Sequence, residues 1–188
     1  MINIPVKRCV TEYFSAGNSG SYVQLGKYIT KNLIELNIND YTPVILCIGT
    51  DRATGDCLGP LVGEQLLNYN NNFNVLGTLS FPVHALNLRQ AISLIHSEIS
   101  NPFVIAVDAA LGSRSHVGYI SVSNCPIAPG KGVNKNLPAI GNISITGIVN
   151  MLSRNPSLLQ STRLHTVKVL ADCIADALKY SIDYLEDF

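Results

Sequence analysis

The fold is decided by residues 44–60, which read VILCIGTDRATGDCLGP. Residues 44–48 are a short, unbroken apolar run rich in β-branched side chains, and Gly49 follows at once. Such a run is typical of a strand that is buried on both faces of a sheet. Pro60 suits the first turn of a helix, and the apolar residues after it continue a helical period. We therefore predict a buried strand and a helix joined by a tight loop.

Strands and helices alternate outward from this unit. We predict a helix that starts at the capping residues 18–21 and ends near Asn37, and another over residues 88–99. Residues 75–79 and 103–107 are predicted strands, and the second ends at Asp108. This order favours an α/β protein with a parallel or mixed sheet and helices on both faces.

The later segments are less regular. Residues 117–122 predict a strand, close enough to its predecessor to run antiparallel, whereas residues 124–141 form an irregular segment that suits a lid or substrate loop. We predict a short helix over 143–152 and a long helix over 164–185, capped by Ser161 or Thr162. No linker divides residues 1–188, so we expect a single domain whose first 16 residues are an irregular arm.

Composition narrows the classes of function. The 13 basic and 13 acidic residues balance and form no run of either sign, which argues against nucleic acid or an anionic membrane as the main partner. The apolar stretches are far shorter than the roughly 20 residues of a spanning helix, and the N-terminus does not resemble a signal peptide.

Five cysteines without a CxxC pair favour a reducing compartment, hence the cytoplasm. Cys47 and Cys173 suit the core, and Cys57 is a weak candidate for a reactive thiol.

Two aspartates are the leading candidates for chemistry. Asp56 lies between the first buried strand and its helix, where it could simply cap the helix N-terminus. Asp108 ends another buried strand, and if the strands are parallel neighbours, both side chains project into one crevice. Two carboxylates at close range share a proton, which separates them into an acid and a base. The residues leave open whether the pair activates a water or holds a divalent cation.

Three further side chains are candidates near this edge of the sheet. Asp51 and Arg52 could contribute to the site, or form a local ion pair that shapes the loop. His84 follows a strand and precedes a helix, so it could face the crevice or have a structural role. The loop has neither the ending of a phosphate loop nor the dinucleotide fingerprint, so nucleotide binding is a minor option.

A resemblance adds to this interpretation. Together the segments 49–63, 82–88, 107–109, 129–132 and 141–147 resemble the YyaC-type sporulation proteins, over roughly residues 40–175. Those proteins are similar to the germination protease that degrades small acid-soluble spore proteins and, more distantly, to the hydrogenase maturation proteases. The resemblance implies a three-layer α/β/α sandwich with a mixed, mostly parallel sheet. It also implies that Asp56 and Asp108 are the catalytic acids, with Gly59 in the motif of the first one.

The resemblance has limits that the residues show. Residues 143–147 contain no histidine to match the nickel-sensing histidine of the hydrogenase maturation proteases, so metal sensing does not carry over. Thr50 and Asp51 also replace the Gly-Asn pair that follows the first strand in that branch.

The leading hypothesis is an aspartate-dependent endopeptidase that acts in sporulation or spore germination, in the forespore or mother cell of a spore-forming bacterium. Asp56 and Asp108 would be catalytic, and Asp51, Arg52, His84 and Gly59 would bind substrate or support the site. Its partner would be a peptide or small protein, such as a spore protein, and no cofactor is expected.

One alternative is a non-catalytic spore assembly protein that binds a peptide or partner. A weaker alternative is a metal-dependent amidase using both aspartates and His84. The oligomeric state stays open.

Overall fold

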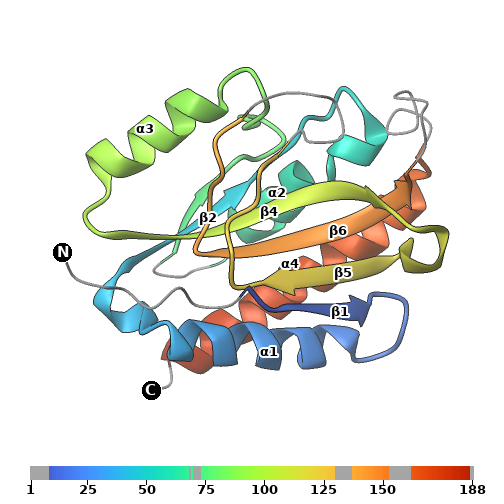
Figure 1. The fold of residues 1–188 in the computed structure, drawn as a ribbon, viewed down its shortest axis with the longest axis horizontal. Coiled ribbons are helices and arrows are strands. Elements are labelled where there is room, and N and C mark those ends of the chain that lie inside the picture. The colour runs from blue at the N-terminus through green and yellow to red at the C-terminus, as the bar shows by residue number, and fades with distance from the viewer. Residues whose placement is uncertain (1–8, 68, 70–72, 130–136, 153–161, 187–188) are drawn as a thin grey trace.

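The computed structural model describes residues 9–67, 69, 73–129, 137–152 and 162–186. The strands form one mixed six-stranded sheet with helices against both faces (Figure 1). In spatial order they are β1 (Thr11–Ser15), β5 (Tyr119–Ser123), β6 (Ile143–Met151), β4 (Pro102–Gly112), β2 (Thr42–Cys47) and β3 (Asn74–Leu76). The predicted α/β/α sandwich with a mixed sheet is therefore confirmed.

The centre of the sheet is parallel. Strand β2 pairs in parallel with β3 and with β4, and β4 pairs in parallel with β6. Residues 44–47 are inaccessible to solvent, which confirms the predicted strand buried on both faces. Cys47, the last residue of β2, pairs with Val107, so Asp108 lies one residue beyond the end of β2.

The helices form two unequal layers. Alternate strand residues such as Ile45 and Ile105 pack against α1 (Ser21–Glu35), α2 (Leu58–Leu67) and α4 (Leu164–Glu186). Their neighbours Leu46 and Ala106 face α3 (Leu88–Glu98) on the other side. All four helices were predicted within a few residues. Helix α4 begins two residues after Thr162, and Ser161 lies outside the described residues.

The prediction of a helix over residues 143–152 is wrong, because these residues form strand β6 between β4 and β5. Ile143 and Ile145 are buried in the larger core, whereas Ser144 and Thr146, between and after them, face the other side. A short apolar run fits either period when it is considered alone. The two flanking ladders decide in favour of the strand.

Two predicted strand ends also differ. Strand β4 does not end at Asp108 but continues to Gly112, since β6 extends the ladder along it with a shift in register after Ala110. The strand predicted over 75–79 ends at Leu76. Gly77, at φ 89°, turns the chain away from the ladder.

The remaining part of the sheet is antiparallel. Strand β5 confirms the strand predicted over 117–122, and it runs antiparallel to its predecessor β4, with β6 lying between them. The predicted irregular arm contains an edge strand, β1, which pairs antiparallel with β5. The prediction missed β1 because five consecutive polar or aromatic residues from Thr11 show no apolar alternation.

A disulfide between Cys9 and Cys125 joins the chain before β1 to the chain after β5, with the Cα atoms 5.7 Å apart. This bond does not fit the reducing compartment predicted from the cysteine pattern. Cys47, Cys57 and Cys173 are free and buried, as predicted for the first and last of them.

The irregular segment 124–141 is described only in part, because residues 130–136 lie outside the described residues. Ile127 and Ile140 form an isolated antiparallel bridge within it. Across the described ranges of the chain, no helix is both long enough and apolar enough to cross a membrane.

Candidate active site

The loop after β2 is held close to the strand by its own backbone. Gly49 donates its N–H to the Val83 carbonyl at 2.8 Å, and Thr50 donates to the Asp56 carbonyl at 3.0 Å. Gly49 adopts φ 144°, and a Cβ there would overlap the Asp56 carbonyl oxygen. Asp56 is the last residue of a short 3-10 turn, η2 (Thr54–Asp56). The loop thus folds back and places Asp56 over the carboxyl end of β2.

Gly59 supports this arrangement by close packing. A Cβ on Gly59 would overlap the backbone of Ile48, so only glycine lets α2 start this close to the end of β2. The preceding residue, Leu58, in turn occupies the space that a side chain at Gly147 of β6 would need. The absence of a side chain at Gly59 therefore sets how closely the helix packs against the strand.

Asp108 lies within a central strand, next to the end of β2. Ile48 donates its N–H to the Val107 carbonyl at 2.7 Å, so the loop of Asp56 begins beside Asp108. Val107 is buried on the face covered by three helices, and Asp108 therefore points to the other face. Its side chain is only 7% exposed.

One oxygen of the Asp108 carboxyl group is satisfied by the protein. Oδ1 accepts a hydrogen bond from the Ala109 N–H at 2.9 Å, and no bond from a described residue reaches Oδ2. Among the described residues, no fully buried side-chain oxygen lacks a partner. The small exposed area of Asp108 therefore includes Oδ2, which can meet a water or a substrate atom.

Burial, followed by the negative charge of Asp56, raises the pKa of Asp108 to about 8, while the hydrogen bond from Ala109 lowers it. At neutral pH Asp108 is therefore mainly a neutral carboxylic acid. Because the charge of Asp56 is one of the causes, the two side chains lie close enough to influence each other. A protonated acid beside a charged carboxylate is the arrangement that general acid–base chemistry requires.

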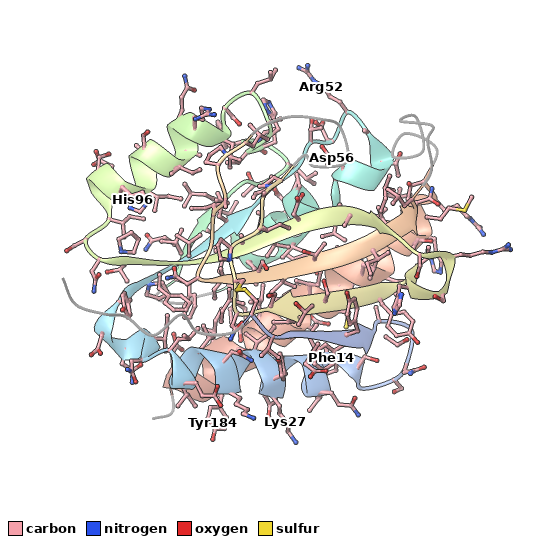
Figure 2. All side chains as sticks on the ribbon, in the orientation of Figure 1. Phe14, Lys27, Arg52, Asp56, His96 and Tyr184 are labelled. Atoms are coloured by element: carbon pink, nitrogen blue, oxygen red, sulfur yellow. A yellow bond between two sulfur atoms is a disulfide. The ribbon has the colours of Figure 1, made fainter. Side chains whose placement is uncertain are left out.

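Asp51 and Arg52 lie outside this arrangement. Both are exposed, and the ion pairs among the described residues do not include an Asp51–Arg52 pair. Instead the Thr50 hydroxyl donates to Asp51 at 3.5 Å and accepts from the Arg52 N–H at 3.3 Å. Figure 2 shows Arg52 pointing away from the molecule, while Asp56 lies nearer the sheet. The alternative that Asp51 and Arg52 form a local ion pair that shapes the loop is therefore wrong.

His84 lies at the same edge of the sheet. Val83 bridges Ile48 in parallel, so His84 follows directly beyond the end of β2. Its Nδ1 accepts the Leu86 N–H at 3.3 Å, and its own N–H donates to Asn87 Oδ1 at 2.7 Å. These bonds form the turn into α3, which is the structural role considered for it. The partly buried ring also lines a groove of about 840 Å³.

Cys57 is a poor candidate for a nucleophile. Its Sγ donates to the Thr54 carbonyl at 3.0 Å. Burial chiefly raises the pKa of its thiol, and the charges of Asp56 and Asp51 add to the rise. Cys57 is therefore a thiol at neutral pH.

A metal-binding cluster is not found in the described part of the chain. No three or more His, Cys, Asp or Glu side chains of the described residues gather into a group that could hold a metal ion.

The structure brings one residue to Asp108 that the sequence analysis overlooked. Thr146 of β6 is the register partner of Asp108, and Ser121 of β5 is the partner of Thr146, so three polar side chains form a row on one face. The signal was present in residues 143–146, where β-branched and polar residues alternate. The wrong helical period concealed it.

Comparisons with known proteins place this chain in a family. The crystal structure of HycI, a [NiFe] hydrogenase maturation protease from Thermococcus kodakarensis KOD1, has a TM-score of 0.38 and 15% sequence identity, and the match covers 76% of this chain and 98% of that one. The uncharacterized protein YyaC of Bacillus subtilis (strain 168) is 49% identical over 137 residues, which are 72% of this chain and 67% of YyaC. This confirms the resemblance to YyaC-type proteins. A family model matches residues 14–177, a range that includes both aspartates. The chain therefore belongs to the family described as "Protein of unknown function (DUF1256)".

Proposed function

We propose that this protein is an aspartate-dependent peptidase in which Asp108 is the general acid and Asp56 the general base. The observation that carries the proposal is Asp108 itself, a carboxyl group 7% exposed whose pKa is raised to about 8 by burial and by the charge of Asp56. An isolated buried carboxyl group is costly to keep in a core unless it has a partner or a function.

The proposed reaction uses each group in the state that the environment favours. The charged Asp56 carboxylate takes a proton from a water, and the water oxygen attacks the carbon of the amide carbonyl. The neutral Asp108 donates its proton to the carbonyl oxygen as the negative charge develops there. When the tetrahedral intermediate collapses, its hydroxyl proton returns to Asp108, and the proton held by Asp56 passes to the departing nitrogen. Both carboxyl groups end in their starting states.

The biological setting belongs to the same proposal. We include small spore proteins as substrates, in sporulation or germination, because of the sequence resemblance to YyaC-type proteins and, through them, to the germination protease. A peptide or small protein is the partner in this proposal, and no cofactor takes part. Within this proposal the protein acts in the forespore or mother cell, which the resemblance to YyaC-type sporulation proteins suggests, whereas the Cys9–Cys125 disulfide favours an oxidising environment.

The test compares wild-type protein with Asp56→Asn and Asp108→Asn variants on small acid-soluble spore proteins, followed by mass spectrometry. Asparagine matches the size of the protonated acid, so we expect both variants to fold and to cleave at a rate lower by about a hundredfold or more. Asp40→Asn is the matched control, because Asp40 is exposed and lies just before β2, at the opposite edge of the sheet.

Three outcomes separate the alternatives. Cleavage that a chelator abolishes would favour the metal-dependent amidase. Binding of a spore protein without hydrolysis by the wild type would favour a non-catalytic assembly protein. Equal cleavage by wild type and both aspartate variants would contradict the proposed roles of Asp56 and Asp108.

A further inference from the structure

A groove of about 840 Å³ runs beside β3, the strand at the end of the sheet opposite β1. Leu67, at the end of α2, lines it on one side, and Ala91 and Leu94 of α3 line it on the other. Val75 and Leu76 of β3 contribute between them. The groove thus follows the edge of the sheet, between the two helical layers.

The walls of this groove hold large apolar side chains that the core does not bury. Phe81 is 81% exposed, and Leu67 and Leu94 are each 53% exposed. All three line the groove. Large apolar side chains gathered in one concave region are typical of a binding site, because leaving them in water stabilises nothing in the free protein.

The strand beside the groove has a free side. Strand β3 is the last in the order of the sheet, and β2 is its partner there. The backbone groups on its outer side therefore belong to no ladder of the described sheet. An extended peptide satisfies such groups when it adds a strand to the edge, and its alternate side chains then enter the adjoining pockets. The shape and chemistry of the groove fit this type of ligand.

The groove reaches residues that contact the loop carrying Asp56. His84 and Asn87 line it, and the Val83 carbonyl next to His84 accepts the hydrogen bond from Gly49. Gly49 is the first residue of the loop, which folds back so that Thr50 donates its N–H to the Asp56 carbonyl. Because β3 and β2 are parallel, a strand added to β3 points along the same axis towards this edge of the sheet.

We propose that the groove beside β3 binds an extended segment of the peptide substrate with large apolar side chains at alternate positions, and directs the adjoining peptide bond to Asp56 and Asp108. This inference rests on the proposed peptidase function. It assigns substrate selection to Leu67, Phe81 and Leu94, which take no part in the chemistry.

The test measures binding separately from cleavage, in the Asp108→Asn protein. The probe is a fluorescein-labelled peptide of alternating leucine and threonine residues between lysine ends, and the readout is fluorescence anisotropy. We expect Leu94→Glu to weaken binding at least tenfold. Leu86→Glu is the matched control, because Leu86 is 84% exposed but does not line the groove, and we expect less than a twofold effect. Of two probes N-methylated at alternate amides, one should lose binding and the other retain it.

Each result has one meaning. Lack of saturable binding, binding that ignores Leu94→Glu, or equal losses from both leucine variants would overturn the groove proposal. Wild-type protein that binds the probe at the groove but cleaves neither the probe nor spore proteins would contradict the peptidase function alone. Cleavage that depends on Asp108 but not on Leu94 would contradict the groove alone.

Discussion

The parallel and antiparallel parts of the sheet are built in different ways. In the parallel part, β2 and β4 are buried between α3 on one face and three helices on the other. In the antiparallel part, β5 buries only alternate residues and the first three residues of β1 are exposed. Both candidate acids belong to the parallel part. The comparison indicates that the candidate chemistry is placed where the core fixes the backbone from both sides.

Substitution of two glycines with almost the same φ should show the largest difference between the parallel and antiparallel parts of the sheet. Gly77 (φ 89°) follows β3 in the parallel part, and Gly118 (φ 88°) precedes β5 in the antiparallel part. A Cβ at Gly77 would overlap the Cys47 carbonyl oxygen, whereas a Cβ at Gly118 meets nothing. We expect Gly118→Ala to cost about 1–2 kcal/mol from backbone strain alone. Gly77→Ala should cost about 4 kcal/mol or more, because backbone overlap is added to the same strain.

Urea unfolding followed by circular dichroism measures both costs under the same conditions. Since φ is matched, the difference between the two variants isolates the packing around β2. Equal destabilisation would show that the end of β2 tolerates displacement, and would remove the basis for a rigid site there.

The antiparallel part depends on a covalent bond instead. The Cys9–Cys125 disulfide closes a long loop, with a sequence separation of 116 between the cysteines, and lies beside the β1–β5 ladder. We expect a Cys9→Ser/Cys125→Ser variant to lose about 2–4 kcal/mol of unfolding free energy. Amide hydrogen exchange should accelerate in β1 and β5, while β2 and β4 remain protected.

A thiol assay provides the control for this prediction. Three of the five cysteines should react in the unfolded, unreduced protein, because Cys47, Cys57 and Cys173 are free. Five reactive thiols would mean that the bond does not form, and faster exchange throughout β2 and β4 would mean that the two parts of the sheet are not independent.

The difference between the buried parallel strands and the exposed antiparallel edge also explains which strands the sequence could predict. Residues 44–48 and 103–107 form continuous apolar runs, so the buried strands and the edge that carries Asp56 and Asp108 were predictable. Strand β1 was not, since an exposed edge strand needs no apolar pattern and depends on pairing with distant β5. Strand β6 was mistaken for a helix because its partners, not its local period, select the strand.

The site shows the same limit. The sequence indicated that two acids would meet, but the proton on Asp108 depends on its burial in the fold. The turn that engages His84 Nδ1 and the alignment of Thr146 with Asp108 likewise depend on tertiary contacts.

The ionisation of Asp108 gives a prediction for stability against pH. The pKa of Asp108 rises from 3.8 to about 8 on folding. Between these values the folded protein keeps a proton that the unfolded chain releases, so the free energy of unfolding falls as the pH rises, by up to about 1.4 kcal/mol per pH unit. Above about pH 8 this contribution is constant. Urea unfolding of the wild type at pH 5, 6 and 7 should show this fall in the free energy of unfolding with pH. In Asp108→Asn the fall per pH unit should be smaller by up to about 1.4 kcal/mol, because asparagine does not titrate.

Asp56→Asn sharpens this prediction, because it removes the second cause of the raised pKa and leaves the first. The pKa of Asp108, followed by the carboxyl carbon signal in NMR, should fall below that of the wild type but stay above 3.8, since burial is the larger cause. Asp40→Asn, at the opposite edge of the sheet, should leave it unchanged. A pKa of Asp108 that ignores the Asp56 substitution would mean that the two carboxyl groups do not share an electrostatic environment. The parallel edge would then carry two separate acids, and the division into an acid and a base would fail even if both residues proved essential.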